Sequence, residues 1–194
     1  MSGTGIRRAE AGDLEDVTET LWLAFEGDPL WSWAFPDHDQ LRPWWRMLVS
    51  AALGHGWVWT ASDHAAAAVW IPPGRKELSA EQEREAGELL AKLLGPRAGE
   101  VEALLESFEG SHPAVPHYYL SLLGTRPADR GKGLGMNLLA KTLRAIDAER
   151  APAYLESSNP TNVPRYEALG FRPTGSFQTP DGSREVATMW RDAP

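Results

Sequence analysis

Residues 130–135, with the sequence RGKGLG, combine two cationic side chains with three glycines at alternate positions. Glycines spaced in this way allow the backbone to curl so that successive N–H groups point into one concavity. An apolar run at residues 117–124 precedes the segment, and a run with helical periodicity at residues 136–150 follows it. A helix at that point adds its positive N-terminal dipole to the same spot. The sequence therefore predicts a phosphate-binding loop.

Two other phosphate loops do not fit this segment. The dinucleotide fingerprint GxGxxG would need glycine at Met136, and the Walker loop would need glycine at Arg126 and Ser or Thr at Gly133. The pattern that does fit is Arg-x-x-Gly-x-Gly, which runs from Arg130 to Gly135. A glycine-rich turn that binds nothing would have the same local sequence, so the choice depends on a second motif.

That second motif is residues 154–171, YLESSNPTNVPRYEALGF, which predicts a short strand, a short helix and a closing Gly-Phe. In this order and spacing, the two motifs resemble the core of the GNAT superfamily of acetyl-CoA-dependent N-acetyltransferases. The resemblance is close over residues 117–171 and loose over the first 60 residues and the segment 79–110. With AVWIPP at residues 68–73, the motifs are most similar to the puromycin N-acetyltransferase-like members.

The resemblance implies an α/β (α+β) GNAT fold with a central mixed, mostly antiparallel twisted sheet flanked by helices. Periodicity and turn residues predict the order β-α-α-β-β, two helices, then β-α-β-α-β-β. The two extra helices are amphipathic and occupy about residues 79–110, so we expect an insertion or lid between the third and fourth strands. At 194 residues, the chain is expected to form one acetyltransferase domain, residues 1–194.

For the cofactor, the resemblance implies that acetyl-CoA lies with its pyrophosphate over the glycine loop and its pantetheine arm along the fourth strand. The amide of Leu123 would then stabilise the oxyanion. Asn159 matches a cofactor-contacting asparagine of the family, although an asparagine before Pro160 is also an ordinary helix cap. The expected cofactor-contacting residues are Leu122, Leu123, Gly124, Arg130, Gly131, Lys132, Gly133, Leu134, Gly135, Asn159, Asn162 and Tyr166.

Amide formation from a thioester requires that the amine lose a proton and that the departing thiolate gain one. Tyr166 matches the tyrosine that lies near the sulfur in the family, so it is the expected general acid; otherwise it is a core tyrosine of a short helix. Glu156 ends a predicted strand, where it would take the amine's proton directly or through water, or else would be solvated. His117 is an alternative base because an imidazole titrates near neutrality, unless its role is structural.

The acceptor side is predicted in residues 26–37, EGDPLWSWAFPD, which the prolines and acidic residues mark as a loop. Aromatic side chains on a loop either pack beneath the sheet or line a pocket for a flat or apolar ligand, and the resemblance favours the pocket. The expected acceptor-binding residues are Glu26, Asp28, Trp31, Trp33, Phe35, His117 and Tyr119.

Composition excludes several classes of function. The chain has no cysteine, which excludes a disulfide framework, a thiolate metal site and a cysteine nucleophile; we expect no metal cofactor. A net charge of -8 argues against a nucleic-acid partner and favours a cationic amine. No apolar run is long enough to span a membrane, so we expect a cytoplasmic protein, monomeric or homodimeric.

The preferred hypothesis is direct transfer of acetyl from acetyl-CoA to a primary amine of a small molecule in a ternary complex. One alternative is a protein or peptide N-acetyltransferase, which would need an open groove, whereas the Trp-rich segment and lid helices indicate a closed pocket. A second alternative is a non-catalytic acyl-CoA-binding domain. Tyr166 and Glu156 favour an enzyme, because a protein that only binds the cofactor needs neither.

Overall fold

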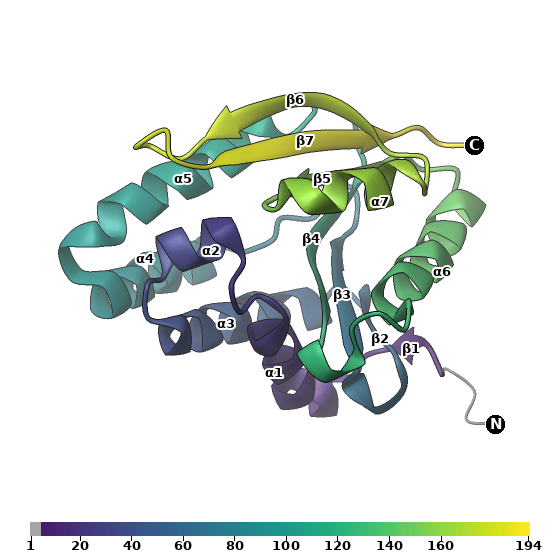
Figure 1. Ribbon diagram of the computed structural model, residues 1–194, viewed down its shortest axis with the longest axis horizontal. Helices are drawn as coiled ribbons and strands as arrows, with labels where there is room; N and C mark the ends of the chain where they lie inside the picture. Colours follow the sequence, from purple (N-terminus) through teal and green to yellow (C-terminus); the bar gives the residue numbers. More distant parts are fainter. Residues whose placement is uncertain (1–4) are drawn as a thin grey trace.

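The computed structural model describes residues 5–194 and contains a seven-stranded sheet in the order β1-β2-β3-β4-β5-β7-β6 (Figure 1). Neighbouring strands are antiparallel except for the parallel pair β4 and β5. This confirms the predicted mixed, mostly antiparallel sheet. The strands are β1 Arg7–Arg8, β2 Val58–Thr60, β3 Ala66–Ile71, β4 Tyr118–Thr125, β5 Ala153–Ser157, β6 Arg172–Gln178 and β7 Glu185–Arg191.

Helices cover both faces of the sheet. The α-helices are α1 Leu14–Ala24, α2 Pro29–Ala34, α3 Leu41–Leu53, α4 Ala80–Leu94, α5 Ala98–Ser111, α6 Leu134–Ala148 and α7 Val163–Glu167. Helices α1 to α5 lie on one side of the sheet and α6 lies on the other (Figure 1). Each side has its own buried apolar cluster, because a sheet with two apolar faces needs a covering layer on each. Among the described residues, no helix is long and apolar enough to cross a lipid bilayer.

The parallel strands β4 and β5 separate partway along their length. They pair only from Tyr118 to Leu120, while β4 continues to Thr125 against β3 alone. At the point of separation, Ser121 is an extra residue in the β3–β4 pairing and forms a bulge. A bulge bends its strand and increases the local twist. The sheet therefore has an open internal edge along the second half of β4.

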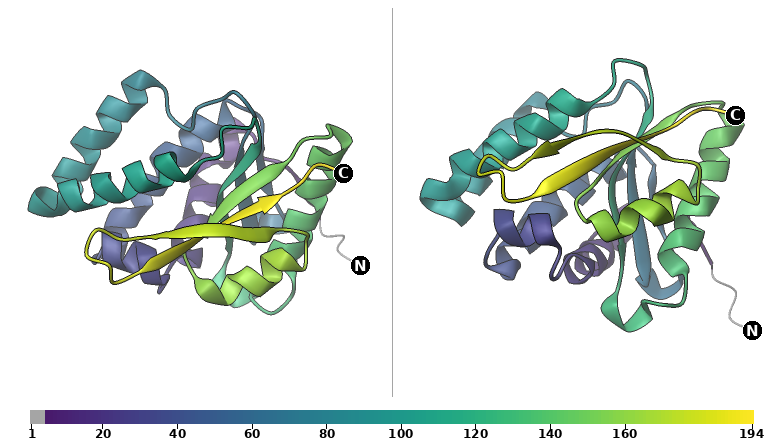
Figure 2. Two further views of the ribbon diagram at one scale, coloured as in Figure 1. Left: turned by 90° about the horizontal axis from the view of Figure 1, so that it is seen from above. Right: turned by 45° about the horizontal axis from the view of Figure 1, so that its top comes forward.

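Residues 79–110 form the two helices predicted for the insertion, α4 and α5, which stand beside the sheet as a helical hairpin (Figure 2). Helix α4 begins with a capping box, in which the side chains of Ser79 and Gln82 each bond the other's backbone N–H. Helix α4 packs against α3. In α5, the ring of Phe108 packs edge-on against the ring of Phe177 of β6, with the ring centroids 5.0 Å apart. That residues 1–194 form a single domain stays a prediction.

The prediction of a loop over residues 26–37 was wrong, because α2 occupies its centre. Asp28 caps this helix by accepting hydrogen bonds from the N–H groups of Leu30 and Trp31 at 3.0 and 3.1 Å, and Pro29 stands at the first helical position. Proline is tolerated there because the first N–H groups of a helix have no intrahelical partner. Asp28 and Pro29, which the sequence analysis interprets as part of a loop, are therefore the start signal of helix α2.

Candidate active site

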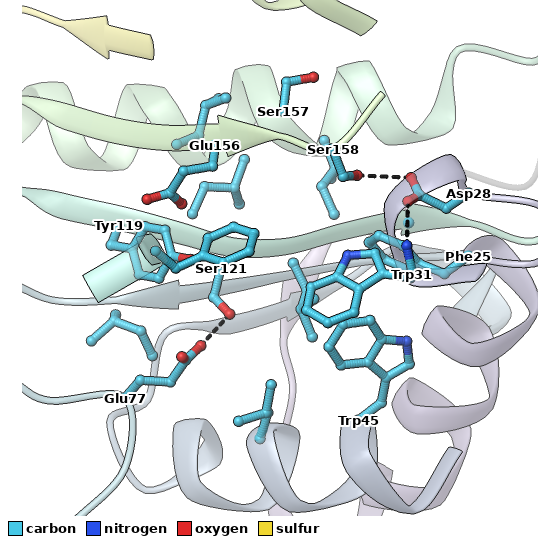
Figure 3. Close-up of a pocket in the computed structure, with 18 of the residues that line it drawn as sticks. Phe25, Asp28, Trp31, Trp45, Glu77, Tyr119, Ser121, Glu156, Ser157 and Ser158 are labelled. Carbon is cyan, nitrogen blue, oxygen red and sulfur yellow. Dashed lines mark hydrogen bonds between the residues drawn. The ribbon is translucent and has the colours of Figure 1, made fainter. Parts of the chain in front are cut away.

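A cavity of roughly 1500 Å³ opens where β4 and β5 separate, and it extends from the glycine loop to the lid helices (Figure 3). Pockets for one drug-sized ligand usually measure about 300 to 1,000 Å³. The cavity is therefore large enough to hold a donor and an acceptor together. Its two ends differ in chemistry, and we call them the donor end, at residues 130–135 and α6, and the acceptor end, beneath α2 and the lid.

The donor end presents backbone groups at the start of α6. Gly133 is the N-cap residue with φ +74°, a left-handed conformation that favours glycine, and no side chain caps the helix there. The uncapped N–H groups and the helix dipole together favour an anion. Arg130 donates a hydrogen bond to the Ala24 carbonyl at 2.8 Å, which fixes the loop against α1. Lys132 instead pairs with Asp129 at 2.6 Å and does not reach the cavity wall.

Gly135 is required for packing rather than for curvature. A Cβ at this position would lie 2.6 Å from Oγ1 of Thr125, well inside van der Waals contact. Glycine here allows the first turn of α6 to approach the end of β4 closely. A side chain at Gly135 would therefore disturb this packing whether or not a phosphate binds nearby.

The open edge of β4 exposes one of the backbone amides predicted to contact the cofactor. The N–H of Arg126 bonds the Ala65 carbonyl at 2.9 Å, so residue 126 directs its backbone groups toward β3. Backbone groups alternate in direction along a strand, which directs those of Leu122 and Gly124 to β3 and those of Leu123 to the open edge. All three residues line the cavity, but Leu123 alone of the three has an N–H available for a ligand there.

Tyr166 lies on α7 and lines the cavity. Burial, followed by the negative charge of Asp28, raises the pKa of its hydroxyl to about 12, so the hydroxyl is protonated at neutral pH. Asn159 and Asn162 also line the cavity, but their side-chain oxygens are bonded locally. Asn159 accepts hydrogen bonds from the N–H and hydroxyl of Thr161 at 3.0 and 2.7 Å, and Asn162 accepts one from Arg165 at 3.2 Å.

Glu156 is the buried carboxyl group of the acceptor end. Its side chain is 1% exposed, and its Oε1 has no hydrogen-bond partner among the described residues. Burial raises the pKa of Glu156 to about 8, although the neighbouring hydroxyls of Tyr154 and Tyr119 lower it in part. A carboxyl with such a pKa is matched to proton transfer near neutrality.

His112, at the end of α5, lies with its Nε2 3.5 Å from Oε1 of Glu156. Burial, with a smaller contribution from His117, lowers the pKa of His112 to about 4. The imidazole is therefore neutral near pH 7 and does not supply a positive charge to the carboxyl. His117 also lines the cavity, where its Nδ1 donates a hydrogen bond to the Val115 carbonyl at 2.7 Å.

A second carboxyl group, that of Glu77, lies in the same end of the cavity, on the loop between β3 and α4 (Figure 3). It accepts a hydrogen bond from the hydroxyl of Ser121, the bulge residue of β4. Burial raises its pKa. Tyr119 lies between the two carboxyls, and burial together with the charges of Glu156 and Glu77 raises the pKa of its phenol far above the usual value.

The sequence analysis did not identify Glu77, Ser121 or His112. Glu77 lies just before the cap residue Ser79 of the first lid helix, separated from it by Leu78, and His112 immediately follows the second lid helix. A titratable residue at each joint of an insertion was the available signal, because those joints connect to the strands that frame the cavity.

The aromatic side of the acceptor end contains one of the three predicted aromatic residues. Trp31 lines the cavity and packs against Trp45, with ring centroids 4.6 Å apart. Phe35 shares its helix face but is 1% exposed in the core, and Trp33 lies on the opposite face, where it donates a hydrogen bond to Asp181 at 2.8 Å. Neither residue lines the cavity: helical periodicity turns Trp33 to the other face, and Phe35 is buried in the core.

The two acidic residues predicted beside these rings both line the cavity. Glu26 is exposed. Asp28 is buried, which raises its pKa, and in addition to capping α2 it accepts a hydrogen bond from the Ser158 hydroxyl at 2.7 Å (Figure 3). This bond connects the start of α2 to the end of β5. Asp28 therefore fixes the cavity wall, and Trp31 with it.

Comparison with known proteins gives a consistent picture. Residues 109–189 match the family model of the acetyltransferase (GNAT) domain. An uncharacterized N-acetyltransferase of Schizosaccharomyces pombe is 24% identical over 184 residues, which cover 85% of this chain and 73% of the relative.

Two solved structures share the fold over nearly the whole chain. One, from Corynebacterium glutamicum, is described as histone acetyltransferase HPA2 and related acetyltransferase. It matches with a TM-score of 0.70 at 22% identity, and the matched region covers 98% of this chain and 97% of the Corynebacterium chain. The other, arylalkylamine N-acetyltransferase 2 of Aedes aegypti, has a TM-score of 0.72 at 16% identity and covers 100% of both chains. The chain therefore has the GNAT fold, and its residues 109–189 match the acetyltransferase (GNAT) domain.

Proposed function

We propose that the protein transfers an acetyl group from acetyl-CoA directly to a primary amine of a small molecule, with both substrates bound in the one cavity. The observation that carries the proposal is that this cavity joins an uncapped helix start at Gly133 to a buried carboxyl at Glu156, whose Oε1 accepts no hydrogen bond from the described residues. The first fits the phosphates of a nucleotide thioester, and the second fits an ammonium group that must lose a proton.

Bound acetyl-CoA supplies the activated acyl group, and the residues of the chain position it. The backbone of residues 130–135 holds the pyrophosphate, and the N–H of Leu123 bonds the acetyl oxygen at the open edge of β4. The hydroxyl of Tyr166, protonated at neutral pH, gives its proton to the departing sulfur. Asn159 and Asn162 stabilise the turn before α7, and so position Tyr166.

Glu156 takes the proton of the amine. An ammonium group beside the carboxyl lowers the carboxyl's pKa, since opposite charges favour each other's ionised form. Glu156 would therefore be ionised in the complex although burial holds its pKa near 8 in the free enzyme. His117 is the weaker candidate for the base, because its Nδ1 is committed to the Val115 carbonyl and Glu156 has a free oxygen.

A small molecule fits the acceptor end, because side chains of α2 and of both lid helices line it. The Aedes aegypti neighbour, which acts on arylalkylamines by its name, has the same fold, whereas the Corynebacterium glutamicum neighbour is described as related to a histone acetyltransferase. We further propose that the chain acts as a single cytoplasmic domain of the puromycin N-acetyltransferase-like subgroup.

A screen for free-thiol release from acetyl-CoA tests the proposal. The panel contains aliphatic amines, arylalkylamines, aminonucleosides, amino acids and peptides with a free N-terminus. We expect release with small amines and not with the peptides. Efficient acetylation of peptides alone would replace the small-molecule acceptor with a protein, and calorimetry that detects no acetyl-CoA binding would overturn the proposal altogether.

A further inference from the structure

Besides the helix-capping Asp28 and the exposed Glu26, the acceptor end of the cavity holds the carboxyl groups of Glu77 and Glu156, and the described residues provide no cation for either of these two. Among residues 5–194, no lysine or arginine pairs with Glu77 or Glu156. His112 contacts Glu156, but burial keeps its imidazole neutral. A buried carboxylate without a cation is costly, so proteins usually pair such groups.

Glu77 is held in place on the side of the cavity opposite Glu156. Its Oε1 accepts the hydrogen bond from Ser121, and the bulge that presents Ser121 is the same one that separates β4 from β5. Tyr119 lies between the two carboxyls (Figure 3). A phenol carries one proton, so Tyr119 donates to one carboxyl at a time. The second oxygen of Glu77 therefore has no donor assigned among the described residues.

The aromatic rings lie at the other side of this chamber. Trp31 and Trp45 are separated from Glu77 and Glu156 in the close-up view, so the chamber has an apolar wall and an acidic wall (Figure 3). An acceptor with one amine would satisfy one carboxyl and leave the other unpaired. A molecule with two cationic nitrogens would satisfy both.

The lid adds negative charge to the approach. Glu102, Glu106 and Glu109 occupy successive turns of α5, are exposed, and line the same cavity. Arg75 and Lys76 also line it, but Lys76 pairs with Glu83 at 3.4 Å. Exposed charges of one sign around a cleft raise the local concentration of counter-charged ligand. These exposed glutamates are weaker evidence than the two buried carboxyl groups, and they favour the same class of ligand, a cation.

We infer that the acceptor is a diamine or a comparable dication, whose reacting nitrogen lies at Glu156 and whose second cationic nitrogen binds Glu77. This inference rests on the proposed function and specifies its substrate class. Glu156 acts on the proton of the amine, so removing its charge lowers turnover. Glu77 binds a nitrogen that does not react, so removing its charge weakens binding of dications selectively.

Matched pairs of acceptors test the inference. The probes are α,ω-diaminoalkanes from propane to octane and the primary monoamines of the same carbon count, assayed by thiol release from acetyl-CoA. Each pair differs only in a terminal ammonium in place of a hydrogen atom. For the diamine of the best length, we expect the wild-type kcat/KM to exceed that of the matched monoamine by about tenfold or more. In Glu77→Gln, the KM of the diamine should rise until this ratio of kcat/KM values is close to one.

Glu88→Gln, which alters an exposed carboxyl of α4 away from the cavity, is the matched control and should leave the ratio unchanged. Glu77→Asp keeps the charge but shortens its reach, so it should retain the preference and shift the best chain length upward. If Glu77→Gln does not fold, the shift in preferred chain length in Glu77→Asp still tests whether Glu77 binds the second nitrogen.

Equal use of diamines and monoamines by the wild-type enzyme would overturn the inference and leave the proposed function intact. A diamine preference that persists in Glu77→Gln would also overturn it, since another group would then bind the second nitrogen. If no amine of either series released thiol but another small amine of the wider panel did, the inference would fail and the proposed function would stand; if no amine of the wider panel did either, the proposed function itself would fail.

Discussion

The donor end and the acceptor end of the cavity are built from different parts of the chain. The donor end uses backbone groups of one short segment, residues 130–135, and the neighbouring strand β4. The acceptor end uses side chains from segments that are distant in sequence, such as Ser158 with Asp28 and Ser121 with Glu77. A site made of local backbone leaves a local sequence pattern, whereas a site assembled by tertiary contacts does not.

The same difference predicts how each end responds to substitution. Side-chain substitutions in the acceptor end remove the groups that do the chemistry or select the amine. Substitutions in the donor end act mainly by disturbing the backbone, because the backbone is what contacts the ligand. Variants at both ends can therefore test whether this division is real.

The largest effect is expected for Glu156→Gln, which removes the base while keeping the size of the side chain. We expect turnover to fall by about 10² to 10⁴ while acetyl-CoA affinity stays the same. In the wild-type enzyme, burial raises the pKa of Glu156 to about 8. Because the ionised form is the active base, kcat/KM for the amine should rise with pH up to about 8 and then level off.

The pH profile separates this role from a structural one. In Glu156→Gln, the rise that ends near pH 8 should disappear, leaving only the titration of the amine itself at about 10. His117→Gln is the control, because His117 lines the same cavity and its Nδ1 already donates a hydrogen bond to the Val115 carbonyl. A wild-type profile that survives in Glu156→Gln and disappears in His117→Gln would transfer the base role to His117.

Tyr166→Phe should have the next largest effect. The ring packing against Phe171, at 6.2 Å between centroids, is preserved, and only the hydroxyl is lost. We expect turnover to fall by about 10² to 10³ at neutral pH with little change in melting temperature. The deficit should shrink at alkaline pH, because a thiol with a pKa of about 8.5 then leaves unprotonated more readily.

A purely structural tyrosine would give the opposite pattern, a lower melting temperature with normal turnover at every pH. The measurement is therefore a pH series of turnover together with thermal unfolding, for the wild-type and Tyr166→Phe enzymes in the same buffers.

The sequence predicted the fold for identifiable reasons. Apolar alternation and turn residues marked the strands, and the spacing of the two motifs indicated the GNAT fold before any contact was known. The failures lie in residues 26–37. In that segment, Asp28 and Pro29 start helix α2, which turns the side chain of Trp33 away from the cavity and buries that of Phe35. Glu77 and His112 gave no motif, because only the lid's placement brings them to Glu156 and Tyr119.

Gly135→Ala tests the donor end. The added Cβ would lie 2.6 Å from Thr125 Oγ1, so we expect a loss of about 1 to 3 kcal/mol in the free energy of unfolding. Combining it with Thr125→Ala removes the clashing oxygen and should restore most of the stability and the acetyl-CoA affinity. Affinity that stays low in the stable double variant would mean that the Cβ obstructs the phosphate itself.

The smallest effects are expected for a pair of tryptophans on one helix, which test the acceptor end residue by residue. Trp31→Phe leaves a gap beside Trp45 in the cavity wall, so the KM of an arylalkylamine should rise by about tenfold while kcat changes little. Trp33→Phe removes an exposed hydrogen bond to Asp181, which costs less than about 1 kcal/mol, and shrinks the ring over which the Arg97 guanidinium lies at 5.6 Å. Neither Trp33 nor Arg97 lines the cavity, so KM should stay unchanged. The two variants carry the same chemical change two residues apart, so a difference in KM reports which helix face meets the acceptor. Equal increases in KM would mean that α2 rearranges when the acceptor binds, and would return Trp33 to the binding wall that the sequence had predicted.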